Sequence, residues 1–128
     1  MKNTELIHVY SGDISSNATV VKATKRLPRP FVVKGIWFTF AGTITYPIYM
    51  RFFIGSPDTT DPVNDPSCRE ITSKLGSSEG ITTLTVHPVV WPEMDIKVDQ
   101  QDRAIIVSFE NKNPGTCKAL VNFHLQMM

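Results

Sequence analysis

The chain has 128 residues, a net charge of +1 and a hydrophobic content of 41%. This length predicts one domain over residues 1–128, and the hydrophobic content excludes a disordered chain. The near-neutral charge creates no overall field toward nucleic acid or anionic lipid. No apolar run is as long as a membrane span, and the first residues lack the apolar stretch of a signal peptide, so no membrane partner and no secretion signal are expected.

Nine segments have the composition or the alternation of β-strands. In chain order they are Leu6–Tyr10, Ala18–Ala23, Phe31–Phe40, Tyr46–Ile54, a weaker Arg69–Leu75, Ile81–His87, Met94–Val98, Ala104–Glu110 and Ala119–Met127. The last segment is the clearest, because apolar and polar residues alternate along its whole length, as in a half-buried antiparallel strand. The sequence predicts an all-β fold, a single β-sandwich of eight or nine mostly antiparallel strands with a jelly-roll-like topology. The expected core residues are Ile48, Phe52, Ile96, Val107, Phe109, Val121, Phe123 and Leu125.

One motif resembles a hydrolase signature. Gly76-Ser77-Ser78-Glu79-Gly80 fits the pattern G-x-S-x-G, and several aspartates and His124 follow it in hydrolase order. A nucleophile elbow requires a helix after the serine, whereas the residues from Ile81 to Val86 continue as a strand. No catalytic residue is therefore predicted, and the protein is not expected to be an enzyme.

Metal and cofactor sites are not predicted either. The three histidines, His8, His87 and His124, lie far apart in the sequence and lack the paired spacing of zinc ligands. The segment Asp58–Asp65 offers three carboxylates for calcium, but aspartate followed by proline also begins turns, and turn chemistry is the preferred interpretation. No glycine-rich phosphate loop is present, so the expected cofactor set is empty.

The cysteines and the basic residues give weaker signals. Cys68 and Cys117 are the only cysteines, and the sequence leaves open whether they pair. Four cations cluster between positions 22 and 29 without interleaved aromatic residues, which favours a solvated connector over a nucleic-acid site.

Two strands carry more apolar residues than one buried face needs. In Phe31–Phe40, Val32, Ile36, Phe38 and Phe40 suit the core, which leaves other apolar residues for the opposite face; Tyr46–Ile54 is similarly two-sided. The surplus would cover about 600–1,000 Å², more than a monomer usually exposes. The residues expected on this second face, and so at an oligomer interface, are Phe31, Val33, Trp37, Tyr49, Arg51 and Phe53. Two explanations stay open, namely burial against a partner and burial under the N-terminal segment or the long proline-rich loop of the same chain. In either case Arg51 would need an acidic partner or a path to solvent.

The strand pattern resembles that of small jelly-roll structural proteins of bacteriophages and other viruses. The residues that carry the resemblance are Val33–Gly42, Tyr46–Ile54, and the stretch from Trp91-Pro92 through Asp99–Asp102, Ala104–Asn113 and Ala119–Gln126, with a polar hairpin expected at Asp99–Asp102. The resemblance implies a capsid, decoration or spike component that forms homo-oligomers or binds other structural proteins, located in the virion or the host cytoplasm. It includes no diagnostic motif, so it assigns no functional residue.

Two hypotheses for function follow. The first is a non-enzymatic structural or assembly protein that acts through its sheet surface, with the virion as the location that the resemblance implies. The alternative is a carbohydrate-binding module that stacks sugar rings on Trp91 or Tyr46 and holds calcium in the Asp58–Asp65 loop. Fold alone does not separate them, because sandwiches support unrelated functions.

Overall fold

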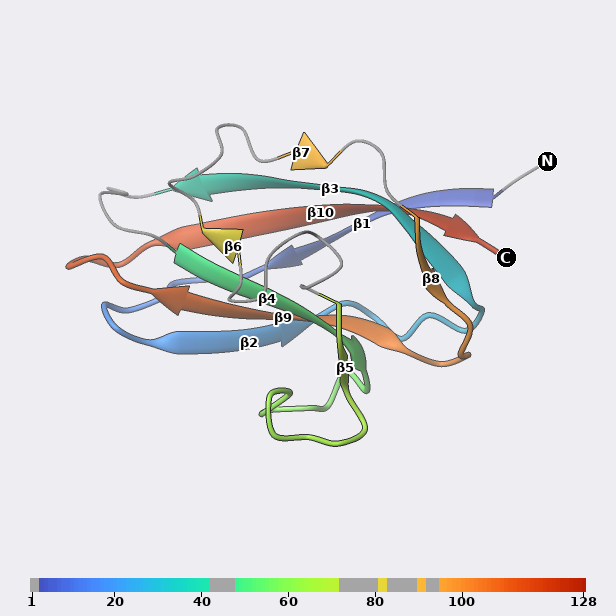
Figure 1. Cartoon of the computed structure of the whole chain (residues 1–128). Coiled ribbons are helices and arrows are strands. Elements are labelled where there is room, and N and C mark those ends of the chain that lie inside the picture. The colour runs from blue at the N-terminus through green and yellow to red at the C-terminus, as the bar shows by residue number, and fades with distance from the viewer. Residues whose placement is uncertain (1–2, 42–47, 72–80, 83–89, 92–94) are drawn as a thin grey trace.

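A computed structural model describes residues 3–41, 48–71, 81–82, 90–91 and 95–128. Within these residues the regular structure consists of strands (Figure 1). The strands are β1 (Asn3–Tyr10), β2 (Thr19–Ala23), β3 (Phe31–Ala41), β4 (Ile48–Gly55), β5 (Arg69–Glu70), β6 (Ile81–Thr82), β7 (Val90–Trp91), β8 (Ile96–Val98), β9 (Ala104–Asn111) and β10 (Lys118–Met127). The described part of the chain contains no helix that is long and apolar enough to cross a membrane.

The strands form two antiparallel sheets that pack face to face (Figure 1). The first sheet has the order β1-β10-β3. Along the outer edge of β3, β7 and β8 follow one another and pair with different parts of that strand. The second has the order β2-β9-β4, with β5 and β6 along the outer edge of β4. Counting each short pair as one interrupted strand gives four strands per sheet. Consecutive strands then alternate between the sheets except at β4 and the β5/β6 strand, which are neighbours in the second sheet. This is the jelly-roll order, so the predicted fold class is confirmed.

The core lies between the two sheets and is built from the inward residues of the alternating strands. All eight predicted core residues are buried, including Phe123 and Phe52, whose rings meet edge to face across the interior. In β10 the burial alternates at every position from Lys118 to Met127, as the sequence pattern predicts. One connection differs from expectation. The segment Asp99–Asp102 joins β8 of one sheet to β9 of the other, so it is a crossover and not a hairpin.

A β-bulge in β3 changes which residues face the core. The register with β10 shifts between His124 and Leu125, because Gly35 pairs with His124 whereas Val33 pairs with Leu125. Lys34 is therefore an extra residue in β3, and the alternation reverses on passing it. Phe31 and Val33 point into the core on one side of the bulge, as Ile36 does on the other.

A network of hydrogen bonds closes one end of the sandwich. The buried side chain of Asn111 donates from Nδ2 to the carbonyl oxygens of Ile14 (2.9 Å) and Gly115 (2.8 Å), and its Oδ1 accepts from the backbone N–H of Asn113 (2.8 Å). Ser16 donates from its hydroxyl to the carbonyl oxygen of Asn113 (2.6 Å). These bonds tie the loops after β1 and β9 together and satisfy the polar atoms of the buried Asn111 side chain.

Candidate functional site

The outer face of the second sheet is divided into a covered half and an open half. The loop of residues 56–68 packs over the covered half, where Phe53 and Ile106 are buried although they point away from the core. A Cβ placed on Gly55 would lie 2.6 Å from Sγ of Cys68 and 3.3 Å from Cδ1 of Ile106, so loop and sheet are in tight contact. A side chain at position 55 would therefore force the side chain of Cys68 to move.

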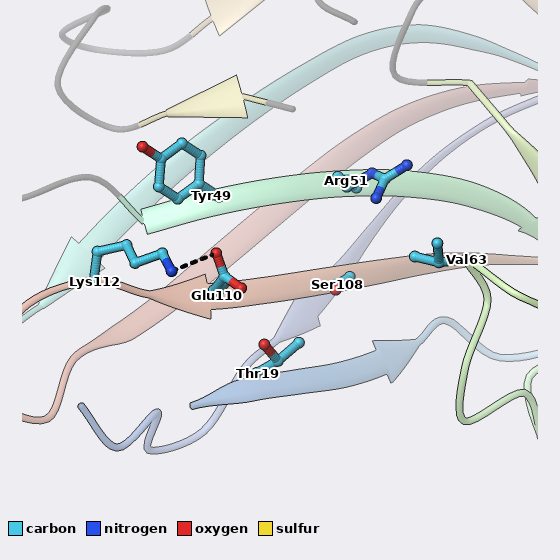
Figure 2. A pocket seen from close by; sticks show the side chains of 7 residues that line it. All are labelled: Thr19, Tyr49, Arg51, Val63, Ser108, Glu110 and Lys112. Atoms are coloured by element: carbon cyan, nitrogen blue, oxygen red, sulfur yellow. Dashed lines mark ion pairs between the residues drawn. The ribbon is translucent and has the colours of Figure 1, made fainter. Parts of the chain in front are cut away.

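The open half is a groove of about 460 Å³ (Figure 2). It is lined by Thr19, Tyr49, Arg51, Val63, Ser108, Glu110 and Lys112. Thr19, Glu110 and Tyr49 lie side by side on β2, β9 and β4, as the registers show. Val63, at 52% exposure, comes from the covering loop and forms one wall. Strands thus supply the floor of the groove, and a loop with three prolines supplies a wall, so the shape is largely pre-formed.

The charges at this groove are paired. Arg51 makes a two-pronged ion pair with Glu70 of β5, from Nε to Oε2 at 3.0 Å and from Nη2 to Oε1 at 2.5 Å. These hydrogen bonds, which outweigh the opposing effect of burial, raise the pKa of Arg51 above its ordinary value. Glu70 supplies the acidic partner that the sequence required for Arg51. Lys112 lies 3.2 Å from the carboxylate of Glu110 (Figure 2).

The six predicted interface residues do not form one patch. β3 and β4 belong to different sheets, because the connection between them crosses the sandwich. Phe31 and Val33 are fully buried in the core as a consequence of the bulge, so their placement on an outer face was wrong. Phe53 does lie on an outer face, but it is only 2% exposed, and the guanidinium of Arg51 sits 5.6 Å from its ring centre.

The other three candidates lie on two separate surfaces. Trp37 is half-buried on the outer face of the first sheet, opposite Asn122. Tyr49 and Arg51 are half-buried in the groove of the second sheet. The predicted inward residue Val32 is only partly buried, and the side chains of Phe38 and Phe40 lie outside the described residues.

The outer face of the first sheet has an unusual composition. Its most exposed large apolar residues are Leu6 (69%) and Tyr10 (50%) of β1. Leu120 is half-buried opposite Tyr10, and Trp37 is half-buried on β3, on the other side of β10. The polar residues on this face of β1, β10 and β3 are Thr4, His8, Thr39, Asn122, His124 and Gln126. Only two lysines of these strands reach this side, and each has an ion-pair partner. Lys34 pairs with Asp95, and Lys118 lies 3.4 Å from Asp13. The face therefore combines exposed apolar groups with few charges.

The residues considered for catalysis and metal binding are placed as follows. The motif Gly76–Gly80, His87 and Tyr46 lie outside the described residues. His8 and His124 lie on the outer face of the first sheet, on neighbouring strands. Within the described part of the chain, no group of three or more histidine, cysteine, aspartate or glutamate side chains is arranged to hold a metal ion.

The aspartates of the long loop make turn contacts. Asp61 accepts from Nδ2 of Asn64 (2.9 Å), and Oδ1 of Asp65 accepts from the hydroxyl (2.6 Å) and the backbone N–H (2.9 Å) of Ser67. These are the local bonds by which aspartate stabilises turns. Cys68 is partly buried in the same loop, whereas Cys117 is buried at the other end of the chain, and no disulfide joins them.

Replacing Ser67 with alanine should raise the pKa of the Asp65 carboxyl toward its ordinary value. The hydroxyl of Ser67 is the main cause of the lowered pKa, and the backbone N–H of Ser67 adds to it. Because the pKa is depressed in the folded state, this turn contributes stability at higher pH that is lost as the pH falls through the folded-state pKa. Carbon-detected NMR titration of the carboxyl would measure the change. Ser56→Ala, in the same loop, is the control that should leave this titration unchanged, and an unchanged titration in Ser67→Ala would contradict the assignment.

No protein-family model and no curated protein matches the chain. Among solved structures, the capsid asymmetric unit of cyanophage Pam1 has 14% identity and a TM-score of 0.46, with 99% of this chain and 86% of that chain covered. The acid-stable capsid of Helicobacter pylori bacteriophage KHP30 has 13% identity and a TM-score of 0.38, with 99% and 94% covered. A structure of infectious bursal disease virus, Gx strain, has 9% identity and a TM-score of 0.22, with 100% and 40% covered.

Two of these structures are bacteriophage capsids, the class of protein that the strand pattern of the sequence resembles. All three TM-scores lie below 0.5, so the likeness by itself assigns no function to this chain.

Sequence reasoning missed most of the groove and most of the exposed face. Thr19, Val63 and Lys112 come from distant segments, and no spacing in the sequence links them. Leu6 and Tyr10 were included in a strand, but which side of that strand would face solvent depends on its pairing with β10.

Proposed function

We propose that this protein is a non-enzymatic, single-domain structural protein that assembles with further copies of itself through the outer face of the first sheet. The observation that carries the proposal is the composition of that face, with Leu6 and Tyr10 exposed on β1 and Trp37 half-buried on β3. On β1, β10 and β3 its charges are limited to two paired lysines, and Lys97 of the edge strand β8 lies 3.8 Å from Asp99. Depletion of charged residues together with exposed aromatic residues is typical of the centre of protein–protein interfaces.

A second copy is the partner that best suits this face. Two copies of a surface with few charges, each of them paired within its own chain, can meet with little repulsion between like charges, which favours a self-complementary interface around a two-fold axis. The outer face of the second sheet is less suited to this role, because the long loop covers one half of it and charged side chains line the other half. The predicted interface residue Trp37 belongs to the proposed contact surface, whereas Tyr49 and Arg51 do not.

We place this assembly in a virus particle, on the basis of the strand pattern that the sequence shares with small viral jelly-roll proteins. A structural role of this kind requires no cofactor and no catalytic group. Mass spectrometry of particles purified from the source of the gene would test the location, and absence of the protein from such particles would refute it.

The double substitution Leu6→Lys with Tyr10→Lys should convert the assembled protein to monomers. Both side chains are exposed, so the fold should survive, whereas each new lysine would face its copy across a symmetric interface. Sedimentation equilibrium at micromolar concentration should show a wild-type oligomer and an association constant lowered about tenfold or more in the variant.

Val63→Lys is the matched control, because Val63 is similarly exposed but lies on the opposite side of the sandwich. It should leave the association constant unchanged. A monomeric wild-type protein, or equal dissociation of the double variant and the control, would refute the proposed interface.

A further inference from the structure

We propose that the groove on the second sheet, whose floor is formed by Thr19, Tyr49 and Ser108, is a binding site for a neutral saccharide. It lies on the face that the assembly proposal leaves unused, so the two proposals stand on different surfaces and on different observations. The site differs from the one the sequence suggested for sugars, which involved Trp91, Tyr46 and calcium.

The dimensions of the floor suit one or two sugar rings. Thr19, Glu110 and Tyr49 occupy one cross-strand row on three adjacent strands. With strands about 4.8 Å apart, this row spans roughly 10 Å. The groove volume of about 460 Å³ lies within the range of small-molecule sites. The second row, Ser108 with Arg51, continues the floor toward Val63.

The electrostatics exclude a strongly charged ligand. Arg51 is bound at two points by Glu70, and Lys112 is paired with Glu110. Each cation that lines the groove thus has a carboxylate partner, and a ligand phosphate or carboxylate would have to displace one. A ligand without net charge can hydrogen-bond to these groups without breaking either pair.

The chemistry of the lining suits a ligand with an apolar face and a polar edge. Tyr49 offers an aromatic ring with a polar tip (Figure 2). The hydroxyls of Thr19 and Ser108 both donate and accept, and the outer atoms of Glu110 and Lys112 supply one acceptor and one donor group. A pyranose ring has this combination, because its C–H groups form an apolar face and its hydroxyls surround the edge. A purely apolar ligand would cover the hydroxyls of Thr19 and Ser108 without hydrogen-bonding to them, which is unfavourable.

The test is NMR titration of the isotope-labelled, full chain with four neutral disaccharides: maltose, cellobiose, lactose and N,N′-diacetylchitobiose. At least one should give saturable shifts at millimolar concentration, localised to β2, β9 and β4 around the groove, since an open site with one aromatic ring should bind weakly. Tyr49→Ala should weaken that binding about tenfold, which equals about 1.4 kcal/mol.

Tyr10→Ala is the control, because it removes an exposed tyrosine from the other sheet and should leave saccharide binding unchanged. The proposal is overturned if none of the disaccharides binds, if Tyr49→Ala binds as well as the wild type, or if glucuronate or glucosamine binds more tightly than every neutral probe. A folded Tyr49→Ala variant, judged by an unchanged circular dichroism spectrum, is required for the comparison. Tyr49→Phe keeps the ring and should retain most of the affinity. If the alanine variant unfolds, Tyr49→Leu, which removes the ring but keeps an apolar side chain, should show the same loss of binding.

Discussion

Replacing Phe123 with alanine should lower the free energy of unfolding by about 3–5 kcal/mol. Phe123 is fully buried, and its ring lies 5.9 Å from that of Phe52, at an interplanar angle of 88°. The two rings belong to opposite sheets, so the substitution removes apolar contact at the centre of the sandwich and leaves a cavity. Urea denaturation followed by circular dichroism would measure the difference.

Leu6→Ala is the control for this substitution, measured below the concentration at which the protein assembles. Leu6 lies one residue from Ile7, the strand partner of Phe123, but its side chain points to solvent. Its loss should change the free energy of unfolding of the monomer by about 0.5 kcal/mol or less. A loss below about 1 kcal/mol in Phe123→Ala would contradict the register of β10.

Replacing Asn111 with alanine should cost about 2–4 kcal/mol, because the substitution removes several hydrogen bonds from a fully buried side chain and leaves a cavity in its place. The side chain serves the carbonyl oxygens of Ile14 and Gly115 and the N–H of Asn113, and Asn111 itself is fully buried. An alanine methyl group can form no hydrogen bond to any of these three backbone groups. Thermal unfolding and urea denaturation would both report the loss.

Asn111→Asp separates the hydrogen bonds from the shape of the side chain. The aspartate keeps the acceptor for Asn113 but replaces the donor to Ile14 and Gly115 with a second oxygen, so it should destabilise the fold as well. Asn64→Ala is the matched control, because Asn64 is exposed and makes a single side-chain bond with Asp61. If Asn111→Asp were as stable as the wild type, the role assigned to Nδ2 would be incorrect.

The strands that alternate strictly could be predicted from the sequence because their burial follows from pairing alone. The inward residues of β10, and Ile105, Val107 and Phe109 of β9, are where the period of two places them. Such strands have one face toward solvent and one toward the core, so the alternation of polar and apolar residues indicates directly which side chains are buried. The same reasoning gave the number of strands to within one or two.

The facing of β3 could not be predicted in this way because a bulge changes the phase of the alternation. Phe31 and Val33 are on the same side as Ile36 only because Lys34 is an extra residue. Gly35 was a usable signal, since an isolated glycine within a strand often marks a bulge. The crossing from β3 to β4 gave no such signal, and the prediction of a shared patch failed mainly for that reason.

The groove and the polar network depend on contacts between distant segments. Asn111 meets Ile14, and Val63 lies beside the outer face of β9, only after the sandwich has formed. The sequence predicted that the N-terminal segment or the long proline-rich loop could cover an outer face, but it contained no signal that favoured the loop over the N-terminal segment. Local propensity does not contain such information, because it reports neighbours in the chain.

The pairing of β1 with β10 affects folding during synthesis as well as the stability of the folded chain. The ribosome synthesises β1 before the other strands. The position between β1 and β3 in the first sheet stays vacant until Lys118–Met127 has been synthesised. Throughout that interval no strand lies between β1 and β3. The nascent chain therefore has unpaired strand edges and apolar residues that the missing strand does not yet cover. Sheets that depend on such non-local pairing fold slowly, in milliseconds to seconds, and are vulnerable to aggregation meanwhile. Rapid production of many copies would therefore place a heavy demand on the chaperones of the cell that makes them.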